Sequence, residues 1–387
     1  MEKKSLVAPI LYAIFALFGI FFITIVILFI MLLTGKIYYI ALIIIGAVVL
    51  YVFNVLTLFH FFKTKKRKMM FGTIAGVAIL MSAISPMQHA YTNRLPTVDA
   101  EVKINKYEPF TNSQRVAILE QQATLQLTDN LPKMDGATAL YPLYASFVQA
   151  TYPKKDYSPY DSDVMVNTTP DAYSNLFNGK VDMIFVASPS EAQKKTAEQK
   201  GLELKMTPIG REAFVFFVNQ KNPIDGLTIE QIQAIYAGKV TNWKDVGGKN
   251  NTIRAFQRPA DSGSQTALEH LMGTIPIKEA PSEDIATGMG GIINEVSKYK
   301  NYKNAIGYTF RFYSTEMVKN NQIKLLEIDD VAPTQETILS GAYPITSEFY
   351  IVTAGTENPN VEKLIEWILS PQGQGLVEKT GYVPISE

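Results

Sequence analysis

Long apolar runs fill the first part of the chain. Two of them, Leu6 to Leu33 and Ile37 to Phe62, contain no charged residue. Each exceeds the roughly 20 residues that a helix needs to cross a hydrocarbon core about 30 Å thick. A third apolar stretch, Met69 to Pro86, is shorter and richer in glycine, alanine and serine. The pattern predicts a three-helix, all-α transmembrane region in residues 1–88, with helices at about 6–33, 37–62 and 69–86.

Positive charges predict the orientation of these helices. Lys3 and Lys4 precede the first run, and the basic cluster KTKKRK, residues 63–68, follows the second. The positive-inside rule puts both groups on the cytoplasmic side, which two crossings allow. A third crossing would export everything after about residue 88, giving a multi-pass protein of the cell membrane with an extracellular carboxyl-terminal domain. Two spans and a cytoplasmic domain are the main alternative.

Beyond residue 130, short apolar runs alternate with segments of helical period. The runs VDMIFVA (181–187), AFVFFVN (213–219) and EFYIVTA (348–354) suit buried strands. The segments YPLYASFVQATY, TIEQIQAIYAG and VEKLIEWILS have the spacing of helices. This alternation predicts an α/β domain with largely parallel sheets over residues 131–387. Residues 89–130 are polar and interrupted by proline, and we expect a linker and lead-in segment there.

Charge and cysteine content exclude several classes of function. The formal net charge is zero, but residues 1–88 hold eight of the 36 basic and one of the 36 acidic residues. The rest of the chain therefore carries a net charge of about −7, which disfavours nucleic acid as a partner. The absence of cysteine excludes disulfides, thiol catalysis, thiolate metal sites and a lipid-modified cysteine. We expect the helices to be the anchor in membrane lipid, and we expect no metal and no cofactor.

Four loops of small polar residues each lead directly into a predicted helix. Two have strong start signals, which are Thr169 followed by Pro170 and a capping box in Ser188-Pro189-Ser190-Glu191. Converging helix starts suit an anion, because they present unpaired N–H groups and positive dipole ends. Such caps are also common without a ligand, so spacing alone leaves both interpretations open. The four loops are Asp135–Thr138, Asn167–Pro170, Ala187–Glu191 and Ser262–Ser264.

An arginine precedes the fourth loop by four residues. In RPADSGSQ, Arg258 can donate two parallel hydrogen bonds to a tetrahedral oxyanion, a geometry that lysine does not match. Gly263 allows the backbone to curve closely around an oxygen atom. The combination favours an anion site over a set of structural caps, without deciding between them.

The segment from about Leu131 to Tyr382 resembles the phosphate-binding receptors of bacterial ABC importers, the PstS-like solute-binding proteins with a type II periplasmic-binding fold. The resemblance implies two α/β lobes joined by two crossing strands, AFVFFVN and EFYIVTA. Lobe 1 would span about 131–214 and 346–387, and lobe 2 about 215–345. The matching segments are DGATALYPLYASF, VDMIFVA, GREAFVFFVN, LTIEQIQAIYAGKVTNWKDVGG, RPADSGSQ, NAIGYTF and YPITSEFYIVT.

The resemblance also implies which residues contact the anion. One departure is Pro189, which stands where many family members have an aspartate that accepts a hydrogen bond from protonated phosphate. Position 189 therefore cannot by itself discriminate phosphate from sulfate, and Asp135 and Asp261 are the nearby acids that could replace the aspartate. The implied ligand-binding residues are Thr138, Ala139, Thr168, Thr169, Ser188, Arg258, Ser262, Gly263 and Ser264.

Together these features predict a membrane-anchored extracellular receptor for phosphate or a similar tetrahedral oxyanion. It would feed an ABC importer, with permease and ATPase subunits as partners. The alternative is a membrane-bound oxyanion sensor or interaction module without transport. A hydrolase is not expected, because the chain has three histidines and His270 lies about 12 Å along the helix from Ser262. We therefore predict no catalytic residue.

Overall fold

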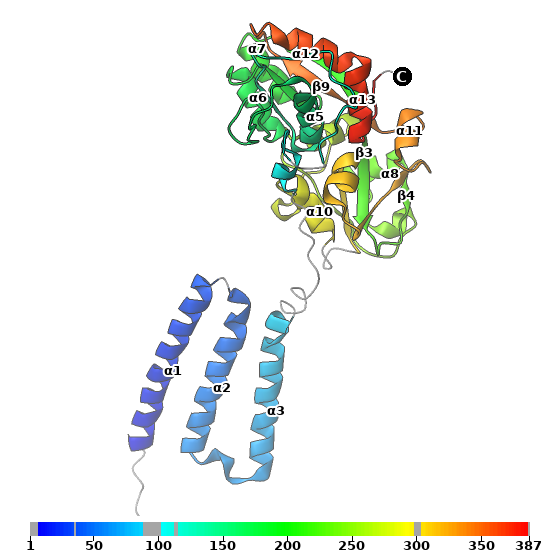
Figure 1. The fold of residues 1–387 in the computed structure, drawn as a ribbon. Coiled ribbons are helices and arrows are strands. Elements are labelled where there is room, and N and C mark those ends of the chain that lie inside the picture. Colours follow the sequence, from blue (N-terminus) through cyan, green and yellow to red (C-terminus); the bar gives the residue numbers. More distant parts are fainter. Residues whose placement is uncertain (1–6, 35, 88–101, 112–114, 298–302, 386–387) are drawn as a thin grey trace, which may run out of the picture. The chain divides into compact units, whose positions relative to one another are not determined.

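Two compact units make up the chain. The computed structural model describes residues 7–34, 36–87, 102–111, 115–297 and 303–385. The first unit covers Met1–Pro96 and the second Thr97–Glu387. Figure 1 draws the described part of the first unit as helices, and the second unit as helices packed on strands. Each unit has its own internal packing.

The first unit is a set of three long helices. They are α1 (Val7–Leu33), α2 (Ile40–Leu58) and α3 (Lys65–Ser82), with the short 3₁₀ helices η1 (Ile37–Tyr39) and η2 (Phe61–Lys63) between them. The chain reverses after α2 at His60, which has a left-handed conformation with φ of 54°. Thr64 then caps α3, because its hydroxyl oxygen accepts a hydrogen bond from the Arg67 N–H at 3.4 Å.

Two of these helical segments are long and apolar enough to cross a membrane, among the residues described. They are Val7–Leu33 and Ile37–Leu58, and none of the residues of α1 or α2 is buried within the unit. The second segment ends four residues before the predicted limit of 62. The third predicted helix, 69–86, lies instead at 65–82 and begins with four basic residues, since lysine and arginine are good helix formers. Its crossing of a membrane stays a prediction.

One long strand joins the two halves of the second unit. β3 (Lys205–Asn219) pairs with β9 (Thr346–Thr353) through residues 205–213, and with β6 (Ala305–Phe310) through residues 214–218. The sheet order is β1-β2-β9-β3-β6-β5, and β7 also pairs with β3. The other strands are β1 (Met134–Gly136), β2 (Met183–Val186), β5 (Arg254–Ala255) and β7 (Ile323–Leu325), with a separate pair formed by β4 (Gly226–Leu227) and β8 (Glu327–Ile328).

The prediction of largely parallel sheets is wrong. Among the paired strands of the described residues, β1–β2, β5–β6 and β4–β8 are parallel, whereas β2–β9, β3–β9, β3–β6 and β3–β7 are antiparallel. The reason is that β3 and β9 run in opposite directions through the middle of the sheet. The crossing strand is also longer than AFVFFVN, since it begins at Lys205. The unit has two lobes. The chain passes from the first to the second where β3 changes its partner from β9 to β6, at residues 213–214, and it returns at the start of β9, Thr346.

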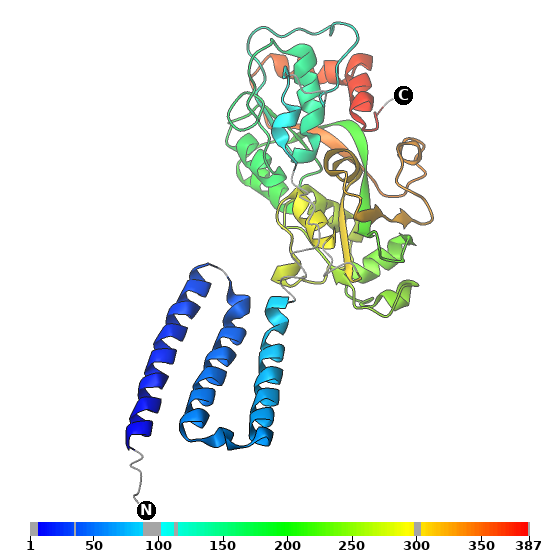
Figure 2. The same cartoon turned by 60° about the horizontal axis from the view of Figure 1, so that its bottom comes forward.

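Helices cover both lobes (Figures 1 and 2). In the first lobe, Phe185 of β2 stacks on Tyr144 with ring centroids 4.8 Å apart, and Phe147 meets Trp367 edge-on at 6.2 Å. The first-lobe helices are α5 (Tyr141–Thr151), α6 (Thr169–Phe177), α7 (Glu191–Gln199), α12 (Asn360–Leu369) and α13 (Pro371–Thr380). The second lobe has α8 (Ile229–Tyr236), α9 (Gly263–Met272), α10 (Met289–Ser297) and α11 (Gln335–Leu339), with a π-helix at Tyr313–Val318 and 3₁₀ turns at Trp243–Val246 and Ser282–Asp284.

The segment before β1 packs on the first lobe. The Leu127 N–H donates to the Thr151 carbonyl at 2.8 Å, and the Thr124 N–H donates to Gln372 Oε1 at 2.8 Å. Tyr107, in the 3₁₀ helix Ile104–Tyr107, is buried. Of the predicted linker and lead-in segment, residues 89–101 and 112–114 lie outside the described residues. The described remainder is part of the α/β unit.

Candidate functional site

A cavity lies between the two lobes of the second unit. Eight of the nine predicted ligand residues line it, and Ser188 is the exception. The first lobe contributes Ala137–Leu140, Thr168–Pro170 and Ala187; the second contributes Arg258–Ala260, Ser262–Ser264, Gly288 and Phe310; and Glu212, Ser347–Phe349 and Tyr382 complete the wall.

The first loop is held close to β2 by a glycine and a buried aspartate. A Cβ on Gly136 would lie 2.6 Å from the Phe185 carbonyl oxygen, so only glycine fits there. Asp135 is buried, and its Oδ2 accepts hydrogen bonds from the side-chain amides of Asn167 and Asn175, both at 2.8 Å. Asp135 therefore fixes the first loop to the second and does not line the cavity. The cavity-lining 3₁₀ turn Thr138–Leu140 follows directly.

The second loop starts α6 one residue earlier than predicted. Thr168, not Thr169, is the N-cap, and its Oγ1 accepts from the Asp171 N–H at 3.4 Å and donates to Asp171 Oδ2 at 2.6 Å. Thr169 is the first helical residue, is buried and lines the cavity. Pro170 follows as the second, which is tolerated because the first-turn N–H groups need no intrahelical partner.

The third loop also caps its helix at a different serine. Ser190, not Ser188, is the N-cap of α7, in a capping box with Gln193. The Ser190 hydroxyl also donates to Asp261 Oδ1 at 2.6 Å, and the Gln193 amide donates to the Asp261 carbonyl at 3.3 Å. These bonds connect the two lobes. Asp261 is thus engaged with α7, and neither Asp261 nor Ser188 is among the cavity residues.

The fourth loop meets the first lobe at close range. Ser262 is the N-cap of α9, and its hydroxyl oxygen accepts from the Gln265 N–H at 3.4 Å. Gly263 and Ser264 are the buried first residues of the helix. A Cβ on Gly263 would lie 3.2 Å from Thr169 Oγ1 and 3.5 Å from Ala187 Cβ. The absence of a side chain at position 263 therefore lets the second lobe approach the first.

Arg258 is a largely buried cation in the cavity wall. Its backbone N–H donates to the Tyr308 hydroxyl at 2.9 Å and to Gln265 Oε1 at 3.2 Å, and its Nη1 donates to the Ala286 carbonyl at 2.8 Å. Its Nε is buried without a hydrogen-bond partner among the described residues. Burial lowers the pKa of the guanidinium, yet an arginine keeps its charge near neutral pH. A buried charge without a counter-ion is costly, and an anion in the cavity would supply one.

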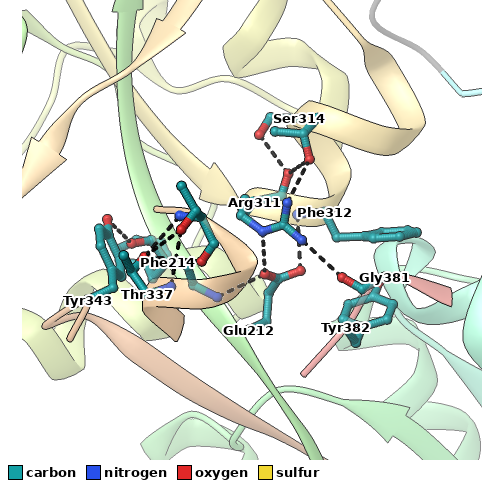
Figure 3. A network of polar contacts seen from close by, with 12 residues as sticks. Glu212, Phe214, Arg311, Phe312, Ser314, Thr337, Tyr343, Gly381 and Tyr382 are labelled. Atoms are coloured by element: carbon teal, nitrogen blue, oxygen red, sulfur yellow. Dashed lines mark hydrogen bonds and ion pairs between the residues drawn. The ribbon is translucent and has the colours of Figure 1, made fainter. Parts of the chain in front are cut away.

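Sequence reasoning missed two acids in the cavity wall, Glu212 and Glu348. Figure 3 shows that Glu212 belongs to a polar network: its Oε1 accepts from the Ala213 N–H at 2.9 Å and lies 3.7 Å from Arg311 Nε, and its Oε2 accepts from the Phe312 N–H at 3.0 Å. Burial raises the pKa of Glu212 to about 7, although Arg311 lowers it. The available signals were an acid directly before the apolar run AFVFFVN and an acid at the start of the run EFYIVTA.

Three other basic side chains, Arg311, Arg211 and His270, do not line the cavity. Arg311 donates from Nη2 to the Gly381 carbonyl at 2.9 Å, and Arg211 donates from Nη2 to the Pro384 carbonyl at 3.4 Å. His270 is exposed on α9 and is not a cavity residue. Within the described ranges, no group of three or more His, Cys, Asp or Glu side chains could hold a metal ion. The cavity wall thus combines a cation, hydroxyls and helix-start N–H groups with the two acids Glu212 and Glu348.

The comparisons with known proteins identify the family of the second unit. A family model described as a PBP superfamily domain matches residues 122–372. The chain belongs to the PBP superfamily. The matched range includes all four loops and Arg258, so the cavity lies within the PBP domain.

Individual relatives and a solved structure agree with this assignment. The phosphate-binding protein PstS of Borreliella burgdorferi is 24% identical over 266 residues, which cover 67% of this chain and 92% of that protein. The PstS of Staphylococcus saprophyticus is 24% identical over 265 residues, covering 65% and 80%. A crystal structure of a candidate phosphate ABC transporter substrate-binding protein from Clostridium perfringens, with bound phosphate, has a TM-score of 0.51 and 22% identity, and the match covers 67% of this chain and 100% of that chain. The PBP domain shares its fold.

Proposed function

We propose that the PBP domain binds phosphate or a similar tetrahedral oxyanion between its lobes, as the receptor of an ABC importer. The observation that carries this proposal is the convergence on one cavity of three helix-start loops and of Arg258, whose Nε is buried. N–H groups at helix starts and a guanidinium fork both bind oxyanions well. The names of the relatives, which are phosphate-binding proteins, support the choice of ligand.

The proposed ligand contacts come from both lobes. The first lobe would offer Thr138, Ala139 and the Thr168–Thr169 pair, and the second Arg258 and Ser262–Ser264. Ser188 is left out, because its side chain does not line the cavity. A ligand held from two lobes stabilises the closed arrangement, in which Ser190 and Asp261 are in contact. The proposed role is binding, without catalysis.

Thermal unfolding tests the ligand. A ligand that binds only the folded state raises the unfolding temperature in proportion to the logarithm of its concentration. The full chain, in lipid nanodiscs, should therefore melt at a higher temperature with phosphate than with the same concentration of chloride. Equal melting temperatures at millimolar phosphate and chloride would rule out the proposed ligand.

The proposal also places the PBP domain outside the cell, held in membrane lipid by α1, α2 and a third crossing through α3. The exposed apolar surface of α1 and α2 supports contact with lipid. Because the chain has no cysteine, a single introduced cysteine is the one site that a maleimide can label. Its labelling shows on which side of the membrane that residue lies. In intact cells, Lys154→Cys in the PBP domain should react with a membrane-impermeant maleimide, whereas Thr64→Cys before α3 should not. Protection of both positions would show two spans and a cytoplasmic domain.

Delivery to a permease is the last part of the proposal. It predicts that phosphate uptake by the host falls when the chain is removed, and returns with the wild-type chain. Unchanged uptake together with phosphate binding would show an oxyanion sensor instead of a transport receptor.

A further inference from the structure

Tyr382, which follows α13, is a residue of the cavity wall that is not among the proposed ligand contacts. It is buried, with 2% of its surface exposed. Its hydroxyl donates a hydrogen bond to the Ala139 carbonyl, so this hydroxyl is used within the protein. Ala139 is one of the proposed ligand-binding residues. Tyr382 is therefore connected to the anion site through Ala139, across 243 positions of the sequence.

The bond from Tyr382 holds one side of a peptide unit in the first loop. The Ala139 carbonyl and the Leu140 N–H belong to the same planar peptide unit. The Leu140 N–H donates to the Ala137 carbonyl at 2.8 Å, and the Tyr382 hydroxyl holds the carbonyl on the other side. Because both polar groups of this unit are held, the plane has one orientation. The 3₁₀ turn that lines the cavity is thus fixed by contacts within the protein.

The ring of Tyr382 is held by residues of both lobes. It stacks on Phe312 with ring centroids 4.3 Å apart, and it meets Phe349 edge-on at 5.0 Å. Phe312 follows β6 in the second lobe, whereas Phe349 lies on β9, where the chain has returned to the first. The neighbouring Gly381 carbonyl accepts from Arg311 Nη2 at 2.9 Å (Figure 3). The backbone and the ring at this position are therefore both tied to the second lobe.

We propose that Tyr382 is a positioning residue of the anion site. Its hydroxyl sets the turn at Ala139 in place before the anion arrives, and its ring ties that turn to the second lobe. This inference rests on the proposed function. A loop that is ordered in advance binds more tightly, because less conformational freedom is lost when the ligand binds. Loss of the hydroxyl therefore lowers the fraction of chains whose first loop is ready to bind, and with it the rate of association.

Tyr382→Phe tests this role, because it removes the hydroxyl and keeps the ring. In calorimetric titration of the full chain in nanodiscs, the dissociation constant for phosphate should rise about three- to tenfold, as for the loss of one neutral hydrogen bond. The number of sites per chain should not change. In stopped-flow measurements the association rate constant should fall by the same factor, while the dissociation rate constant stays near that of the wild type.

Tyr157→Phe is the matched control. Tyr157 is also buried in the first lobe, and its hydroxyl also donates to a backbone carbonyl, that of Pro153 at 2.9 Å. Tyr157 does not line the cavity. This variant loses a comparable hydrogen bond, so its affinity for phosphate should equal that of the wild type.

The two kinetic constants separate positioning from the other roles of the hydroxyl. Slower association in Tyr382→Phe alone supports the inference. A loss of affinity that comes from faster dissociation would show that the hydroxyl contacts the anion directly, and would overturn the positioning role. Unchanged affinity, an equal loss in Tyr157→Phe, or fewer sites at unchanged affinity would also overturn it, and the receptor function would stand. A wild type that does not bind phosphate overturns both.

Discussion

Truncation of Arg258 to alanine should remove most of the affinity of the chain for phosphate. Arg258 is the cavity-lining cation, and its Nε is buried without a hydrogen-bond partner among the described residues. Removal of one partner from a buried charge pair costs about 2 to 5 kcal/mol. With 1.4 kcal/mol for each factor of ten, the dissociation constant should rise roughly thirty-fold to several thousand-fold.

The structure indicates that this loss will be local. The Arg258 N–H is held by the Tyr308 hydroxyl and by Gln265 Oε1, so the loop backbone keeps two hydrogen bonds when the side chain is removed. Arg258→Lys should lie between the wild type and Arg258→Ala, because lysine keeps the charge but not the planar fork. Arg211→Ala is a matched control: Arg211 is also partly buried in the PBP domain, but it does not line the cavity.

Calorimetric titration of the three variants and the wild type measures the effect. An affinity of Arg258→Ala within a factor of three of the wild type would refute the assignment of Arg258 as the anion's main partner. A similar loss in Arg211→Ala would show that the effect comes from general damage to the domain. Melting temperatures of the unliganded variants separate these two explanations.

Three further predictions concern closure and pH. Gly263→Ala should weaken phosphate binding with little effect on unliganded stability, because the added methyl group would lie 3.2 Å from Thr169 Oγ1 in the opposite lobe; unchanged affinity would contradict this. Asp261→Gly should speed phosphate release about three- to tenfold in stopped-flow measurements, since it removes the bond from Ser190; an unchanged rate would refute the contact. Burial raises the pKa of Glu212 from 4.5 to about 7. Its contribution to the free energy of unfolding should therefore be present below pH 4.5 and be lost as the pH rises through 7. Denaturant melts of Glu212→Gln should not show this pH-dependent loss.

The helix-start loops were predictable because capping is local chemistry. Ser262 caps α9 where the sequence places a cap. The third loop shows where prediction from local sequence fails. Two capping boxes overlap there, and one begins at Ser188 and the other at Ser190. The structure takes the second, and Ser190 also donates to Asp261, which is 71 residues away. Such a tertiary contact cannot be read from the local sequence.

The direction of the strands and the acids of the cavity wall were not predictable in the same way. Apolar runs indicate burial, but the pairing of β3 with β9 and β6 joins residues at least 88 positions apart in the sequence, as in Val218 with Ile306. A carboxylate within or beside such a run, as at Glu212 and Glu348, has the same local pattern whether it faces solvent or a cavity. Only the assembled lobes distinguish Glu212, which is paired with Arg311, from Glu348.

The predicted membrane region was likewise predictable in part. The lengths of α1 and α2 were indicated by charge-free runs of residues. The start of α3 was not, because its four initial basic residues have high helix propensity and Thr64 caps them. Composition therefore locates the apolar segments, and capping chemistry decides where the helix begins.

The most direct test of the central claim is a calorimetric titration of phosphate into the wild-type chain in nanodiscs. The account predicts saturable binding of one phosphate per chain, at the cavity that contains Arg258 and the three helix-start loops. Absence of a saturable signal up to millimolar phosphate would contradict it.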